Sequence, residues 1–268
     1  LTNRLVSAAA YADGQKGNAS NDSILNPDEK VNKNSENISE SSSQNSNIKN
    51  EKFTFNNFVV GPSNKFAYTA SLRVAENPGS VFNPLFIYGN SGLGKTHLLN
   101  AIIEKLKSNN PDAVIVYTTS EDITNDLYFA IQTKTTHDLH QKYRTCDALL
   151  IDDIQMIAGK TQTEEEIFHT FDTLIKAGKQ IVLTSDKPPS AIPKIEDRLK
   201  TRFESGLLCD IQPPDFETRL AIIKDKANYL RFELPDDVCS FIAENIKSNV
   251  RQMGSAVKNI YAYCSFNN

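Results

Sequence analysis

The chain has 268 residues, of which 39% are hydrophobic, and its formal net charge at pH 7 is -4. This length allows one large hydrophobic core or two modest ones, and the acidic balance excludes a global positive field that would attract nucleic acid or anionic lipid. The four cysteines are far apart without a CxxC pair, and neither a signal peptide nor a bilayer-spanning apolar stretch is present. The sequence therefore predicts a cytoplasmic protein with reduced thiols and no zinc site.

Residues 1–52 differ in composition from the rest of the chain. From Gly17 to Asn50 about half of the positions are Ser or Asn, and no aromatic residue occurs. Such a segment cannot bury enough apolar surface to offset the entropy lost on ordering, so we predict a disordered Ser/Asn-rich linker. The chain begins with Leu1 rather than Met, as a fragment of a longer protein would.

From Phe53 onward, short apolar runs alternate with segments of helical periodicity. This alternation predicts an α/β fold, in which a parallel sheet is flanked by helices on both faces and carries the nucleotide-binding subdomain at 53–212. After Pro213 and Pro214 the pattern is all-helical and predicts a small lid subdomain at 213–268. We expect strands at 83–89, 113–119, 147–154 and 179–186, and helices at 64–77, 97–107, 121–132, 136–144, 163–178, 215–231, 235–247 and 249–264.

The stretch GNSGLGKT at 89–96 matches the pattern GxxxxGK[ST] through Gly89, Gly94, Lys95 and Thr96, with Gly92 as an additional glycine. Glycines allow successive backbone N–H groups to face phosphates, while the lysine adds a positive charge near the β- and γ-phosphates and the threonine hydroxyl can bind Mg²⁺. An ordinary glycine turn is the alternative. The predicted strand before the motif and the predicted helix after it favour the phosphate-binding loop.

Two carboxylates end the predicted strand in LLIDDI at 149–154. We expect Asp152 to bind Mg²⁺ directly or through water, and Asp153 to polarise an attacking water molecule. The alternative is a solvated strand end. The next predicted strand ends in TSD at 184–186, which would place a hydroxyl or a carboxylate near the γ-phosphate.

Three arginines are candidates for contacts with phosphate. Arg198 and Arg202 are four residues apart, on one face of a predicted helix. Such a pair alone indicates a solvated helix face, but in a P-loop ATPase with a helical lid it would reach the nucleotide of a neighbouring subunit. Arg251 begins a predicted lid helix and would contact the γ-phosphate from the same chain.

Other side chains on the predicted helices have structural interpretations. His97 follows the loop and is expected to pack or cap rather than to catalyse. Phe168 and Phe171 are expected to form an apolar core stripe. The three glutamates at 164–166 would favour the positive N-terminal end of their helix.

Six stretches in order resemble the ATPase domain of the bacterial chromosomal replication initiators, the DnaA family of the AAA+ group. The resemblance covers residues 53–264, and six stretches in order are far more specific than a P-loop alone. The stretches are FTFNNFVVGPSNKFAYTASLRVAENPG, NPLFIYGNSGLGKTHLLNAI, KYRTCDALLIDDIQMIAGK, TEEEIFHTFDTLIKAGKQIVLTSDKPP, IEDRLKTRFESGL and IQPPDFETRLAII.

The resemblance implies a bound ATP or ADP with Mg²⁺. Thr96 and Asp152 would hold the metal, Asp153 would complete the acidic pair, and Asp186 would be the first sensor. Arg202 would be the arginine finger, with Arg198 at the same interface. The implied nucleotide-binding residues are Gly89, Asn90, Ser91, Gly92, Leu93, Gly94, Lys95, Thr96 and His97 in the loop, Val59, Val60 and Asn64 near the adenine, and Arg251 as the second sensor.

The resemblance also implies partners. An ATP-dependent oligomer would assemble at the replication origin and unwind it, with slow ATP hydrolysis ending the active state. The helical insertion at about 121–144 would bend the oligomer into a filament and line a channel for single-stranded DNA. Duplex origin boxes would be bound by a C-terminal domain absent from the 268 residues. The replicative helicase and acidic phospholipids would be contacted through other missing regions.

The chain departs from the family in two places. It has NVRQMGSAV at 249–257, where members usually have NVRELEGAL, and Gln162, where members often have a basic residue thought to contact single-stranded DNA. Because Lys160 remains, we expect a weaker or altered DNA contact.

Two other functions remain open. One is a DnaA-like regulatory or helicase-loader protein that acts through protein partners, against which the long linker argues. The other is an unrelated P-loop enzyme such as a small-molecule kinase, for which we find no substrate pocket in the sequence.

Overall fold

The computed structural model describes residues 53–80 and 82–266, so the linker predicted at 1–52 lies outside the described residues. A five-stranded sheet in the order β2-β3-β4-β1-β5 forms its centre, and every strand pairing is parallel. Parallel pairing places the carboxyl ends of all strands at one edge of the sheet. The strands are β1 (Leu85–Tyr88), β2 (Ile115–Thr119), β3 (Ala148–Asp152), β4 (Gln180–Ser185) and β5 (Leu207–Asp210).

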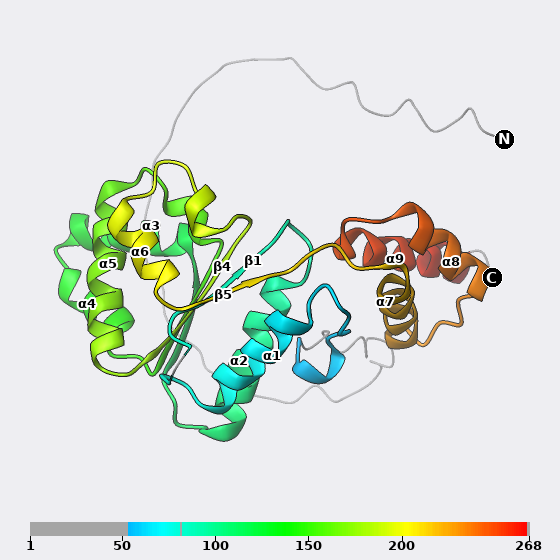
Figure 1. The fold of residues 1–268 in the computed structure, drawn as a ribbon, viewed down its shortest axis with the longest axis horizontal. Coiled ribbons are helices and arrows are strands. Elements are labelled where there is room, and N and C mark those ends of the chain that lie inside the picture. Colours follow the sequence, from blue (N-terminus) through cyan, green and yellow to red (C-terminus); the bar gives the residue numbers. More distant parts are fainter. Residues whose placement is uncertain (1–52, 81, 267–268) are drawn as a thin grey trace, which may run out of the picture. The chain divides into compact units, whose positions relative to one another are not determined.

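Helices cover both faces of this sheet, which confirms the predicted α/β class (Figure 1). Successive strand residues point to opposite faces. Leu85 and Ile87 therefore pack with α1 and α2, whereas Phe86 between them packs with α3 to α6. These helices are α1 (Lys65–Glu76), α2 (Lys95–Asn109), α3 (Ser120–Thr133), α4 (Thr136–Arg144), α5 (Thr161–Lys176) and α6 (Asp197–Glu204). Three short 3₁₀ helices are η1 (Phe55–Asn57), η2 (Ile154–Ile157) and η3 (Pro189–Ala191).

Strand β5 is a strand that the sequence did not predict. It has four residues and follows α6 almost directly, so its apolar run is too short to give a strand pattern. Leu207 N–H donates to the Pro84 carbonyl at 2.9 Å, which extends the pairing with β1. A Cβ atom at Gly206 would lie 1.9 Å from the same carbonyl oxygen, so this close approach requires glycine.

Three helices after the sheet form the small helical subdomain, here called the lid. They are α7 (Phe216–Tyr229), α8 (Asp236–Asn245) and α9 (Val250–Phe266). Asp215 caps α7 by accepting a hydrogen bond from Thr218 N–H at 2.8 Å. The lid has its own apolar core, which includes Ile223, Ala243 and Met253. Val250 N–H at the start of α9 donates to the Gly92 carbonyl at 3.0 Å, which connects the lid to the predicted phosphate loop.

Within residues 53–80 and 82–266, no helix is both long enough and apolar enough to cross a bilayer.

Candidate nucleotide-binding site

The loop between β1 and α2 has the geometry of an anion-binding turn. Gly89, Gly92 and Gly94 have φ values of 152°, 80° and 104°, which side chains with a Cβ atom rarely adopt. Gly94 is the N-cap of α2. The N–H groups in the first turn of a helix have no partner within the helix, and the helix dipole adds positive potential there. The loop therefore presents backbone donors where a phosphate group would bind.

The Lys95 ammonium group lies inside this loop. Only 6% of the residue is exposed, so its charge requires polar partners. Nζ donates to the Gly89 carbonyl at 2.6 Å and to the Asn90 carbonyl at 3.2 Å. It also forms an ion pair with Asp186 Oδ1 at 2.6 Å. The structure thus brings the predicted first sensor into contact with the lysine of the loop.

Asp152 at the end of β3 is held by three hydroxyl groups. Its Oδ2 accepts from Thr96 Oγ1 at 2.8 Å and from the Tyr117 hydroxyl at 3.4 Å. Its Oδ1 accepts from Thr184 Oγ1. Burial, and secondarily the Asp152 carboxylate, raises the pKa of Tyr117 to about 12, so this phenol remains a proton donor at neutral pH. Thr96 and Asp152, the two predicted metal ligands, are therefore in direct contact.

Asp153 follows in the left-handed conformation, with φ 55° and ψ 49°. Its backbone N–H donates to Thr184 Oγ1 at 3.0 Å, and its Oδ1 accepts from Gln155 Nε2 at 3.2 Å. Gln155 Oε1 in turn accepts from Asp186 N–H at 3.4 Å. A residue other than glycine in this conformation is uncommon, and such strain concentrates at functional sites.

Thr184 offers a test of this network. We expect Thr184→Val to lower the free energy of unfolding by roughly 1–3 kcal/mol, because Asp152 Oδ1 and the Asp153 N–H both lose their hydroxyl partner. Urea unfolding would measure the change. Thr184→Ser keeps the hydroxyl and should unfold within about 1 kcal/mol of wild type. A valine variant as stable as wild type would show that the hydroxyl does not stabilise the two aspartates.

A cavity of about 910 Å³ adjoins the loop, which is within the usual range for small-molecule sites. Ser91, Gly92, Lys95 and Thr96 line it on the sheet side. Side chains from the start of α3 and from the segment after β3 line it as well, and α7 and α9 complete it from the lid. Its further lining includes Phe53, Gly94, His97, Thr119, Ser120, Glu121, Asn125, Asp153, Gln155, Met156, Lys160, Asp186, Lys226, Val250, Arg251, Gly254, Ser255 and Lys258.

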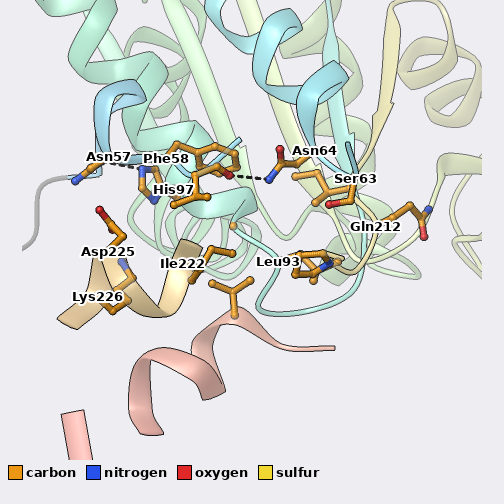
Figure 2. Close-up of a pocket in the computed structure, with 15 residues that line it drawn as sticks. Asn57, Phe58, Ser63, Asn64, Leu93, His97, Gln212, Ile222, Asp225 and Lys226 are labelled. Atoms are coloured by element: carbon orange, nitrogen blue, oxygen red, sulfur yellow. Dashed lines mark hydrogen bonds between the residues drawn. The ribbon is translucent and has the colours of Figure 1, made fainter. Parts of the chain in front are cut away.

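A second, smaller pocket of about 50 Å³ lies next to this cavity, and Gly94, His97, Lys226 and Val250 line both. In Figure 2, Phe58, Asn64 and His97 lie on one side of this pocket and Ile222 of α7 on another. Asn64 Nδ2 donates to the Val59 carbonyl at 3.0 Å, which fixes the segment before α1.

Val59, Asn64 and Leu93, three of the residues predicted to bind nucleotide, line the smaller pocket. Val60 lines neither pocket and is 43% exposed. The structure therefore brings Val59 and Asn64, but not Val60, to the smaller pocket.

His97 packs against two aromatic rings, which is one of the two structural roles predicted for it. Its ring lies 4.9 Å from that of Phe53 and 5.0 Å from that of Phe58, measured between centroids. Its Nε2 lies 2.8 Å from the Thr54 carbonyl oxygen, which can only accept, so this nitrogen carries the proton. The side chain therefore anchors the segment that forms one wall of the smaller pocket.

The predicted arginines occupy two different places. Arg251 lines the large cavity from the first turn of α9. Arg198 and Arg202 on α6 line neither pocket. Arg202 NH2 instead forms an ion pair with Asp172 Oδ1 at 2.7 Å in its own chain.

The site fits a magnesium nucleotide in the chemistry of its donors. Within the described residues, no group of three or more His, Cys, Asp or Glu side chains could hold a metal ion. Mg²⁺ is commonly bound by one or two protein oxygen ligands together with phosphate oxygens and water. The Thr96 hydroxyl and the Asp152 carboxylate match that requirement.

Comparisons with known proteins agree with the geometry of the site. The family described as the bacterial DnaA ATPase domain matches residues 49–210. The crystal structure of domain III of the replication initiation protein DnaA from Thermotoga maritima is 44% identical, with a TM-score of 0.79, and the match covers 81% of this chain and 91% of that one. AMPPCP-bound DnaA from Aquifex aeolicus is 38% identical, with a TM-score of 0.74, over 78% of this chain and 65% of that one.

Two further structures match this chain, one of an initiator with bound DNA and one of a helicase loader. A replication initiator DnaA bound to AMPPCP and single-stranded DNA is 38% identical, with a TM-score of 0.74, over 79% of this chain and 65% of that one. The chain therefore spans just under two thirds of the longer initiator structures. The DnaC helicase loader is 14% identical, with a TM-score of 0.52, over 59% of this chain and 96% of that one, so that match reflects the fold alone.

Proposed function

Because this chain belongs to the family of bacterial DnaA ATPase domains, we propose that it is an ATP-switched, self-assembling module of a chromosomal replication initiator. The observation that carries the proposal is a pair of contacts, Lys95 with Asp186 and Thr96 with Asp152. They lie beside a cavity that is lined by residues of both the sheet and the lid. A P-loop with its lysine and threonine and an acidic strand end are the parts that P-loop nucleoside triphosphatases share.

Each side chain has a proposed role at the nucleotide. The loop amides and Lys95 bind the phosphates, and Thr96 with Asp152 binds Mg²⁺, which would neutralise phosphate charge. Asp153 orients the attacking water for slow hydrolysis, Asp186 senses the γ-phosphate, and Arg251 contacts it from the lid. The smaller pocket beside Val59 and Asn64 receives the base. Support comes from the positions of these side chains: all but Asp152 line one of two adjoining pockets, and Asp152 contacts Thr96.

Self-assembly is the proposed output of ATP binding. Arg202 lies on α6, outside the lining of both pockets of its own chain, so a role at phosphate requires a second copy. We propose that Arg202 contacts the ATP of an adjacent copy, with Arg198 at the same interface. ATP would then stabilise the interface through charge-assisted hydrogen bonds that ADP cannot offer.

Single-stranded DNA is the proposed nucleic-acid partner, and unwinding of origin DNA is the proposed result. Lys160 Nζ lies 3.4 Å from Thr124 Oγ1 on α3, so a cation adjoins the helical insertion predicted to line the DNA channel. The bound DNA in the matched initiator structure supports this proposal. Contacts with duplex origin boxes, the replicative helicase and phospholipids remain predictions about other regions.

The alternative function is a regulator or helicase loader that acts through protein partners. It has weaker support, because the matched loader shares only 14% identity, against 44% for the initiator domain.

Light scattering on the full chain tests the proposal. Wild type with a non-hydrolysable ATP analogue should form oligomers, and wild type with ADP should not. Arg202→Ala should bind the analogue but remain monomeric. Arg73→Ala, on an exposed side chain of α1, is the matched control and should assemble. A wild-type chain that binds the analogue yet stays monomeric would overturn self-assembly and favour the regulator.

A further inference from the structure

Two guanidinium groups share one aromatic ring on the surface formed by α5 and α6. The Cζ atom of Arg198 lies 4.8 Å from the centroid of the Phe168 ring, and that of Arg202 lies 5.7 Å from it. Both distances are within the range of cation–π attraction. Phe168 is only partly buried, whereas Phe171, one turn further along α5, is completely buried. The interpretation of Phe168 as an ordinary core residue is therefore incomplete, because its ring also supports the two arginines.

The backbone beneath these arginines is well anchored. Leu199 and Phe203, their immediate neighbours on α6, have no exposed surface. The Phe203 ring packs 5.5 Å from that of Phe86 on β1 and 5.9 Å from that of Phe171 on α5. The start of α6 is tied down as well, because buried Glu164 accepts from Glu196 N–H at 2.8 Å. Side-chain rotation is thus the main freedom left to the two arginines.

Among the described residues, each guanidinium group contacts one carboxylate, and both groups remain accessible. Arg198 Nε contacts Glu196 Oε2 at 2.5 Å, and Arg202 NH2 contacts Asp172 Oδ1 at 2.7 Å. The two arginine side chains are 40% and 39% exposed. A guanidinium group has five N–H donors in a planar fork. One carboxylate contact and one ring contact can restrict its orientation and still leave donors for another ligand.

We propose that Phe168 is a positioning residue for assembly, and that its ring holds Arg202 in the orientation that meets the triphosphate of a second copy of this chain, with Arg198 held at the same interface. The inference rests on the proposed role of Arg202 at a neighbouring nucleotide. An arginine that rotates freely loses rotamer freedom when it binds, and this loss opposes association. Stacking on a fixed ring restricts the rotamers before the copies meet, so it lowers that cost without touching the nucleotide.

Substitutions that remove only the ring test the inference. Phe168→Leu keeps an apolar side chain and removes the π face. Phe168→Met also removes the π face, and its side-chain volume is closer to that of phenylalanine. We expect both variants to need about fivefold more protein for half-maximal assembly with the ATP analogue, as loss of cation–π attraction predicts. Affinity for the analogue, measured by fluorescence at protein concentrations below assembly, should match wild type. Phe168→Tyr keeps the ring and should assemble as wild type does.

The outcomes separate this inference from the proposed function. Arg202→Ala is measured alongside. If Arg202→Ala abolishes assembly while the leucine and methionine variants assemble at the wild-type concentration, the role of Phe168 is overturned and the function stands. If Arg202→Ala assembles normally, both fail. Loss of assembly in Phe168→Tyr, at an unchanged melting temperature, also overturns the role of the ring. The role of Phe168 is supported if assembly is weakened in the leucine and methionine variants and unchanged in Phe168→Tyr.

Discussion

The Lys95→Ala variant is expected to lose about 100-fold or more in affinity for ATP. In the proposed complex the ammonium group donates charge-assisted hydrogen bonds to phosphate oxygens, each worth roughly 1.5–3 kcal/mol, and two such bonds account for the loss. In this structure the three donors of the same group contact two loop carbonyls and Asp186, so phosphate binding exchanges two of these contacts for phosphate contacts. Titration with a fluorescent ATP analogue measures the affinity.

Lys107→Ala provides the matched control. Lys107 lies on the same helix, in its last turn, and is exposed. Its removal changes the net charge by the same amount without altering the loop, so affinity should remain within about twofold of wild type. Melting temperatures establish that both variants are folded. An alanine variant at Lys95 that binds ATP nearly as tightly as wild type would contradict the assignment of the phosphate site.

The Asp153→Asn variant is expected to slow ATP hydrolysis by about 100-fold or more while nucleotide affinity changes little. The amide cannot accept a proton from the attacking water as the carboxylate can. Asparagine tolerates the left-handed conformation that this residue adopts, at φ 55°, so the backbone should be retained. Release of phosphate under single-turnover conditions measures the rate. Oligomers formed with ATP should persist longer, because hydrolysis is the proposed end of the assembled state.

Asp112→Asn is the control for this change. Asp112 is exposed in the turn before β2 and lies 40 residues before Asp152 in the sequence. The substitution therefore removes the same charge without changing the predicted acidic pair. Hydrolysis should proceed at the wild-type rate. A wild-type rate in Asp153→Asn itself would mean that another group orients the water, and the role proposed for Asp153 would be wrong.

Much of the fold could be predicted from the sequence, because its longer elements have strong periodicity. The strands that became β1, β3 and β4 are apolar runs buried on both faces, whereas β2 at the edge of the sheet is only partly buried. Strand β5 could not be predicted, because its four residues gain strand geometry only through pairing with β1. Pairing between distant segments leaves no local pattern to detect.

The candidate site divides in the same way. The loop at Gly89–Thr96 and the acidic strand end have fixed spacing, so they could be recognised. Tyr117 and Gln155, which contact the aspartates, were missed because single hydroxyl and amide residues in or after strands are common, and the hydroxyl of TSD was expected at the γ-phosphate rather than at Asp152. Their role depends on the register of the sheet, in which Thr119 lies opposite Asp152 and Ile151 opposite Leu183.

Phe168 shows a second limit of sequence patterns. Helical spacing places it near the core side of α5, next to Phe171 in the apolar stripe. The same spacing cannot indicate which side chains of α6 cover its ring. Whether an aromatic residue fills a core or supports charged neighbours is decided by packing between elements.

The most direct test of the central claim is to mix two variants that cannot assemble alone. Arg202→Ala keeps the nucleotide site and loses the arginine, whereas Lys95→Ala keeps the arginine and loses the site. With a non-hydrolysable ATP analogue, light scattering should give monomers for each variant alone and a dimer for the equimolar mixture. In that dimer Arg202 of one chain contacts the nucleotide of the other, and growth stops there. A mixture that stays monomeric under conditions in which wild type assembles would contradict ATP-bridged assembly through Arg202.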